Sequence, residues 1–125
     1  MLKDQPESLV ATNNLAMLLA EYKTDEASQK RALALTRALL ESDEAAYLDT
    51  IGWVEYKNHN FQRAVDFLEK AVKGAPDAAF IHYHLGMAYL GLGKPVPAKK
   101  NLKEALEGEL NFYGKEEARK ALEKL

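Results

Sequence analysis

Hydrophobic and small residues recur along the chain in two adjacent stretches, residues 45–78 and residues 79–112, which align without a gap. The second stretch repeats the size and polarity pattern of the first 34 residues later. The matched pairs are Gly52 and Gly86, Ile51 and Leu85, Ala64 and Ala98, Leu68 and Leu102, and Ala71 and Ala105. Self-similarity at a fixed period of this length indicates a repeat architecture, in which each unit stacks on the next.

Each stretch is predicted to contain two amphipathic helices that are joined by a turn. Gly52 and Gly86 lie in the middle of the first helix of each pair, where glycine costs about 1 kcal/mol relative to alanine. We therefore expect a close approach between helices at these two positions, with the alanines of the second helix as the small partners. Gly93 followed by Pro95 predicts a helix end and a new helix start in the later unit.

The repeat resembles the tetratricopeptide repeat, which has a period of about 34 residues and the pattern W-x2-L-G-x2-Y, then A-x3-F, then P. The matching residues are Leu48, Ile51, Gly52, Ala64, Leu68, Ala71 and Pro76, followed by His82, Leu85, Gly86, Tyr89, Ala98, Leu102 and Ala105. Leu48 and His82 stand where the family has Trp, and Glu55 stands where it has Tyr. The resemblance implies an all-α fold, an antiparallel helix-hairpin right-handed solenoid.

The whole chain, residues 1–125, is predicted to be one domain of about three such units and a C-terminal capping helix. The segments are a degenerate first repeat at 7–44, repeats at 45–78 and 79–112, and a capping helix at 113–125. The first unit is assigned because Leu15 and Ala16 align with Ile51 and Gly52. The last segment has one apolar stripe and a polar remainder, as a terminal helix requires. The segment NNLAMLLAEY, followed by LDTIGWVEY, also resembles the terminal region of large bacterial tetratricopeptide proteins.

The resemblance implies that the first helix of each unit lines a concave groove that binds a partner. With Ile51 and Gly52 assigned to the hairpin core, helical spacing gives the stripe that faces the groove. This peptide-binding groove is predicted to comprise Asn13, Met17, Asp49, Trp53, Tyr56, Tyr83, His84, Met87 and Leu90. Aromatic residues on a helix often belong to the core, but Leu48, Ile51, Leu85 and Tyr89 already fill that role here. We therefore expect Trp53, Tyr56 and Tyr83 to be exposed in the groove.

The groove chemistry favours an apolar or aromatic segment of another protein as the partner. Some tetratricopeptide domains hold a C-terminal carboxylate with cationic side chains at set groove positions. Those positions here are Asn13, Met17, Thr50, Phe80 and His84, none of which is Lys or Arg. The predicted function is thus a protein–protein interaction scaffold that binds a peptide or helix carrying large apolar side chains.

A second hypothesis is a structural, self-associating module cut from a longer tetratricopeptide array. The segment LAMLLA is apolar nearly all round, so another copy of the chain could cover it. This alternative predicts a homodimer through the N-terminal helix, with contacts by Leu15, Met17, Leu18 and Leu19.

Charge and composition argue against other classes of function. The net charge is −2, without the basic excess that nucleic-acid binding requires, and there are no cysteines. His82 and His84 are two residues apart on a helix and point to different sides, so they cannot share a metal ion. No catalytic constellation, cofactor motif or membrane-spanning run is found, so we expect no enzyme activity, no cofactor, no metal and no membrane insertion. The compartment stays open.

Overall fold

The computed structural model describes residues 6–108, 112 and 114–125, and all the regular secondary structure of these residues is helical. The elements are α1 (Pro6–Tyr22), α2 (Glu26–Thr36), a 3₁₀ turn η2 (Arg37–Leu39), α3 (Ala45–Lys57), α4 (Phe61–Gly74), α5 (Ala79–Gly91), α6 (Pro95–Glu107) and α7 (Lys115–Glu123). The predicted all-α class is confirmed. Residues 109–111 and 113, which include the predicted start of the capping segment, lie outside the described residues.

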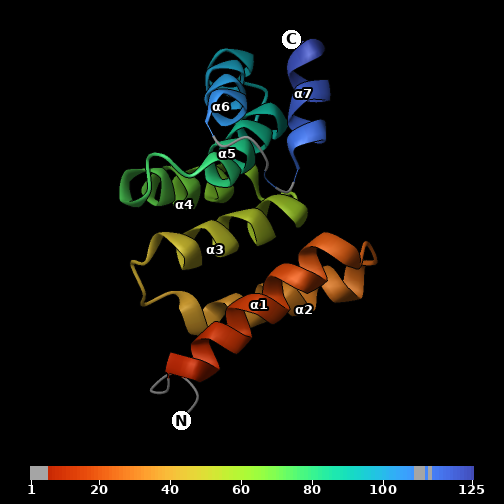
Figure 1. The fold of residues 1–125 in the computed structure, drawn as a ribbon. Coiled ribbons are helices and arrows are strands. Elements are labelled where there is room, and N and C mark those ends of the chain that lie inside the picture. Colours follow the sequence, from red (N-terminus) through yellow and green to blue (C-terminus); the bar gives the residue numbers. More distant parts are fainter. Residues whose placement is uncertain (1–5, 109–111, 113) are drawn as a thin grey trace.

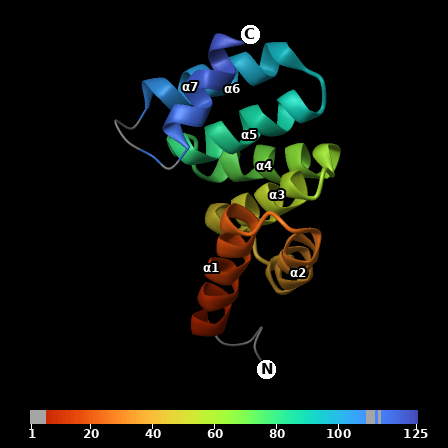
Figure 2. The same ribbon diagram turned by 90° about the vertical axis from the view of Figure 1, so that its right-hand side faces the viewer.

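Consecutive helices pair as hairpins, α1 with α2, α3 with α4 and α5 with α6, and the hairpins stack in chain order (Figure 1). Helices α1 and α7 lie at opposite ends of this stack, and α7 packs against α5 and α6 (Figure 2). The first helices of the hairpins also contact one another, α1 with α3 and α3 with α5. The predicted groove helices are therefore neighbours in space.

Glycines in α3 and α5 allow the two helices of a hairpin to approach closely, as the sequence predicted. A Cβ atom added at Gly86 would lie 2.8 Å from Leu102 Cγ and 3.2 Å from the Ala98 carbonyl oxygen. Gly52 stands in the same relation to the corresponding residues of α4. The turn between α5 and α6 contains Gly93 at a φ of 81°, and α6 begins at Pro95. The local rules for hairpin formation are thus met.

The turn between α1 and α2 is held by side chains that reach the backbone. Asp25 caps α2 by accepting a hydrogen bond of 3.0 Å from the Ser28 amide. The buried Gln29 side chain donates to the carbonyl oxygens of Ala20 at 3.1 Å and Lys23 at 2.6 Å. Asn58, after α3, donates to the Gln29 carbonyl oxygen at 3.0 Å, which ties the first hairpin to the second. These bonds fix α1 relative to α3.

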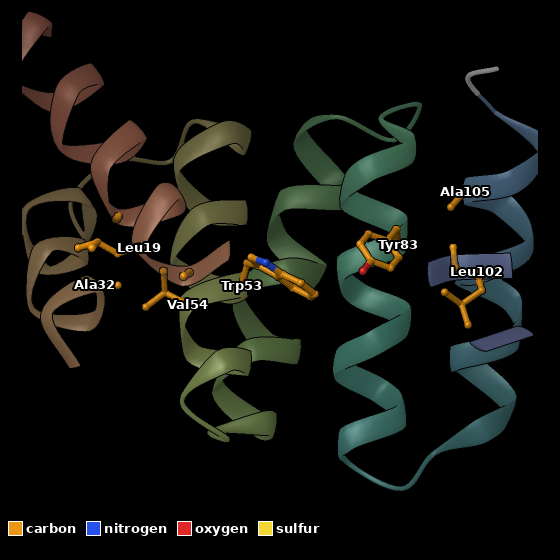
Figure 3. Close-up of a cluster of buried hydrophobic side chains, with 10 residues drawn as sticks. Leu19, Ala32, Trp53, Val54, Tyr83, Leu102 and Ala105 are labelled. Atoms are coloured by element: carbon orange, nitrogen blue, oxygen red, sulfur yellow. The ribbon is translucent and has the colours of Figure 1, made fainter. Parts of the chain in front are cut away.

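The core runs through the stack as a series of buried clusters. Leu48, Ile51 and Leu85 are buried, as their predicted core role requires, while Tyr89 is half-buried. One cluster connects α1, α3, α5 and α7, because these helices contribute Ala16, Trp53, Tyr83 and Ala118. Figure 3 shows Trp53 and Tyr83 of this cluster on neighbouring helices. This cluster lies along the line of residues that the sequence assigned to the groove.

Candidate protein-binding groove

A cavity of about 450 Å³ lies between α1 and α5, whose backbones do not pack directly against each other. We call it the α1–α5 pocket. Its lining residues are Met17, Leu18, Glu21, Tyr22, Phe80, His84 and Phe112. Leu18 is 54% exposed and Tyr22 is 61% exposed, so large apolar surface borders the opening. Exposed apolar surface around a concave site is a common mark of a binding surface.

Helical spacing explains why these side chains meet. Leu18 and Tyr22 are four residues apart on α1, and Phe80 and His84 are four residues apart on α5. Residues at this spacing share one face of a helix. The α1–α5 pocket is therefore walled by two i, i+4 pairs that face each other across α3.

Trp53 lies behind the wall of this pocket and touches both of its polar residues. Its indole N–H donates a hydrogen bond to the Glu21 carboxylate on α1. Its ring stacks on the His84 ring of α5, with 4.0 Å between the ring centroids. Because Trp53 belongs to α3, its side chain connects this helix to α1 and α5, the two helices that wall the pocket (Figure 3).

A buried hydrogen bond between His84 and Asp49 joins α3 to α5 beneath the same site. His84 Nδ1 lies 2.7 Å from Asp49 Oδ1, and both side chains are buried. Burial raises the pKa of Asp49, the partner His84 opposes this rise, and the negative charge of Glu21 adds to it. The hydrogen bond from Nδ1 to the carboxylate fixes the orientation of the His84 ring that lines the pocket.

The expectation that Trp53 and Tyr83 are exposed is wrong. Trp53 is 2% exposed and Tyr83 is 6% exposed. Both belong to the core cluster, because α1 brings Ala16 and Ala20 against Trp53, while Phe112 packs over Tyr83 with 6.0 Å between the rings. Small residues on α1 allow this helix to pack closely on α3.

The other predicted groove residues divide between different environments. Met17 and His84 line the α1–α5 pocket. Met87 and Leu90 instead line a second apolar cavity of about 440 Å³ between α5 and α7. The remaining three are Asp49, which is buried, and Tyr56 and Asn13, which are half-buried. Burial raises the pKa of the Tyr56 phenol, whose ring stacks on Trp53 at 4.7 Å.

The residues proposed for self-association are also split. Leu15 and Leu18 are exposed on α1, but Leu19 is buried in the core cluster, so its assignment to a dimer contact is wrong. Met17 is half-buried and lines the pocket. Sequence reasoning did not assign Leu18, Glu21, Tyr22 or Phe112 to the groove, and it named Phe80 only as a groove position without a cation. The i, i+4 pairs on α1 and α5 were a signal for these residues.

His82, which stands where the repeat family has Trp, is a packing residue. Its ring is buried, with Nδ1 3.0 Å from Asn101 Oδ1 and Nε2 2.7 Å from the Pro76 carbonyl oxygen. Within the described part of the chain, no three His, Cys, Asp or Glu side chains come together as metal ligands. None of the described helices combines the length and the hydropathy needed to cross a membrane.

Comparison with known proteins relates this helix-hairpin architecture to proteins of known type. No family model matches the chain. Over 82 residues it is 32% identical to the TPR repeat-containing protein PA4667 of Pseudomonas aeruginosa, a match that covers 66% of this chain and 14% of that protein. The chain is a tetratricopeptide-type helical repeat. The match to a bacterial protein agrees with the resemblance seen in the N-terminal segments.

A solved structure shows the same fold at low sequence identity. The tetratricopeptide-type chain superposes on SycD, a type III secretion translocator chaperone of Yersinia enterocolitica solved as an alternative dimer, with a TM-score of 0.72. The identity is 15%, and the match covers 97% of this chain and 90% of that one. The likeness concerns the fold alone.

Proposed function

We propose that this tetratricopeptide-type chain is a non-enzymatic interaction scaffold whose α1–α5 pocket binds an apolar or aromatic segment of a partner protein. The observation that carries the proposal is the exposure of Leu18, Tyr22 and Phe80 around this cavity. Among the residues that line it, Glu21 is the one acidic side chain and His84 the one basic side chain. A tetratricopeptide-type fold supports such a scaffold role at the level of the fold.

The size of the pocket suits one or two large side chains of the partner. A large aromatic residue buries about 150–250 Å². At about 25 cal/mol per Å², one such anchor contributes roughly 4–6 kcal/mol before the costs of association. Two anchors less those costs correspond to a dissociation constant on the order of micromolar. We therefore expect a contact that exchanges readily.

A charge placed at Leu18 tests the pocket. Leu18→Glu is expected to weaken capture of apolar peptides from an array by about tenfold or more, because a carboxylate cannot be buried there without a partner. The side chain is 54% exposed, so folding is retained, as circular dichroism can verify. The matched control is Val96→Glu on α6, where the side chain is 80% exposed and does not line the pocket. Equal losses in both variants would reject the pocket as the binding site.

A second candidate function is self-association through α1. Val10, Leu15 and Leu18 are exposed apolar residues on that helix, and Leu15 does not line the α1–α5 pocket. The dimeric state of SycD supports this candidate. We expect wild type to sediment as a dimer and Leu15→Glu as a monomer in analytical ultracentrifugation. A wild-type monomer at high protein concentration would remove this candidate and leave the groove proposal intact.

A further inference from the structure

We infer that Glu21 makes the α1–α5 pocket selective for a partner segment in which a large apolar side chain stands next to a Lys or Arg. This inference rests on the proposed groove function and names the chemistry of its ligand.

Glu21 is placed to meet a ligand group that enters the pocket. It is the only Asp, Glu, Lys or Arg among the residues that line this cavity. The Trp53 indole N–H binds its Oε1 atom and so fixes the direction of the carboxylate. Across the described residues, no Lys or Arg side chain forms a salt bridge with Glu21. Its second oxygen therefore has no cationic partner among the residues that the structure describes.

The charges around the pocket reinforce this preference. The Asp49 carboxyl group lies behind His84, with Oδ1 2.7 Å from His84 Nδ1, and the negative charge of Glu21 raises the pKa of Asp49. Helix α5 contributes no Lys, Arg, Asp or Glu along its length. Apolar walls with charge of one sign focus an electric field on the cavity, here a field that attracts cations.

Lys57, a cation close to the Trp53 ring, faces another site. Lys57 Nζ lies 5.2 Å from the centroid of the Trp53 ring. Lys57 lines a separate polar cavity together with residues of the α1–α2 turn, α2 and the α3–α4 turn, rather than the α1–α5 pocket. It therefore leaves Glu21 available to a Lys or Arg of the partner, which would donate a charge-assisted hydrogen bond.

The selectivity is tested with three synthetic peptides that share one apolar anchor and differ in the adjacent residue, which is Lys, Gln or Glu. Binding of each peptide is measured by fluorescence anisotropy to wild type, to Glu21→Gln and to the control Glu26→Gln. Glu26 is exposed on α2 and pairs with Lys30 at 2.9 Å, away from the pocket. We expect wild type and Glu26→Gln to bind the Lys peptide about tenfold tighter than the Gln peptide, and the Glu peptide most weakly. Glu21→Gln is expected to bind all three alike.

The possible outcomes separate this inference from the proposed function. Equal binding of the three peptides by wild type would overturn the selectivity and leave the groove function standing. Failure of wild type to bind any of them would overturn both. A salt titration of wild type gives an independent check that needs no variant. Affinity for the Lys peptide should fall with ionic strength while affinity for the Gln peptide stays constant, and parallel salt dependence would reject the role of Glu21.

Discussion

Replacing Trp53 by alanine is expected to lower the free energy of unfolding by about 3–5 kcal/mol. The Trp53 ring is buried at the point where α1, α3 and α5 meet, and it contacts rings of Tyr56, Tyr83 and His84. Truncation removes this apolar contact and leaves a cavity, and the Glu21 carboxylate loses its indole donor. Urea denaturation followed by far-ultraviolet circular dichroism measures the effect without relying on tryptophan fluorescence.

Two further substitutions separate the causes of that loss. Trp53→Phe keeps an aromatic ring but removes the N–H donor, so it should cost less than Trp53→Ala and still disturb Glu21. Val96→Ala, at a side chain that is 80% exposed, should change the free energy of unfolding by no more than about 0.5 kcal/mol. A Trp53→Ala loss as small as that of Val96→Ala would contradict the central position of Trp53.

Replacing His84 by phenylalanine is expected to cost about 3–5 kcal/mol at neutral pH. The new ring can still stack on Trp53, but Asp49 becomes a buried carboxylate without its hydrogen-bond donor. Guanidinium denaturation of wild type and His84→Phe across a pH series measures the effect. Adding Asp49→Asn to His84→Phe should recover part of the loss, since the buried group is then uncharged. No recovery in the double variant would mean that packing, not charge, dominates at this position.

The pH dependence of this loss has a definite sign. Burial raises the folded-state pKa of Asp49 above its ordinary value of 3.8, so the folded state binds more protons in the window between the two values. Stability from this group is therefore present below pH 3.8 and lost as the pH rises through the raised pKa. In His84→Phe the imidazole no longer lowers the pKa of Asp49, and the window extends to higher pH. The difference between wild type and variant should thus grow as the pH rises from acid to neutrality.

The helix hairpins were predictable from sequence because their signals are local. Gly52 and Gly86 each face a leucine and a carbonyl oxygen of the next helix, so the small residues and their period follow from contacts within one unit. The burial of His82 in place of the family's Trp also follows from its position in the repeat.

The burial of Trp53 and Tyr83 could not be predicted from helical spacing alone. Spacing gives the side of the helix on which a residue lies, but not how closely the neighbouring hairpins approach. Trp53 is covered because Ala16 and Ala20 let α1 come close, and Tyr83 is covered by residues that follow it by more than twenty positions, such as Phe112. Met87 and Leu90 line the cavity between α5 and α7, and spacing along α5 does not predict the position of α7 either. The open part of the predicted groove is therefore shifted toward the exposed edges of α1 and α5.

The most direct test of the account is a nuclear magnetic resonance titration of the chain with the apolar peptide that binds most tightly in the array. Amide shifts are expected to change along Met17–Tyr22 and around Phe80 and His84, with little change in α4 and α6. Amide shift changes confined to α4 and α6, or to the cavity between α5 and α7, would contradict binding in the α1–α5 pocket.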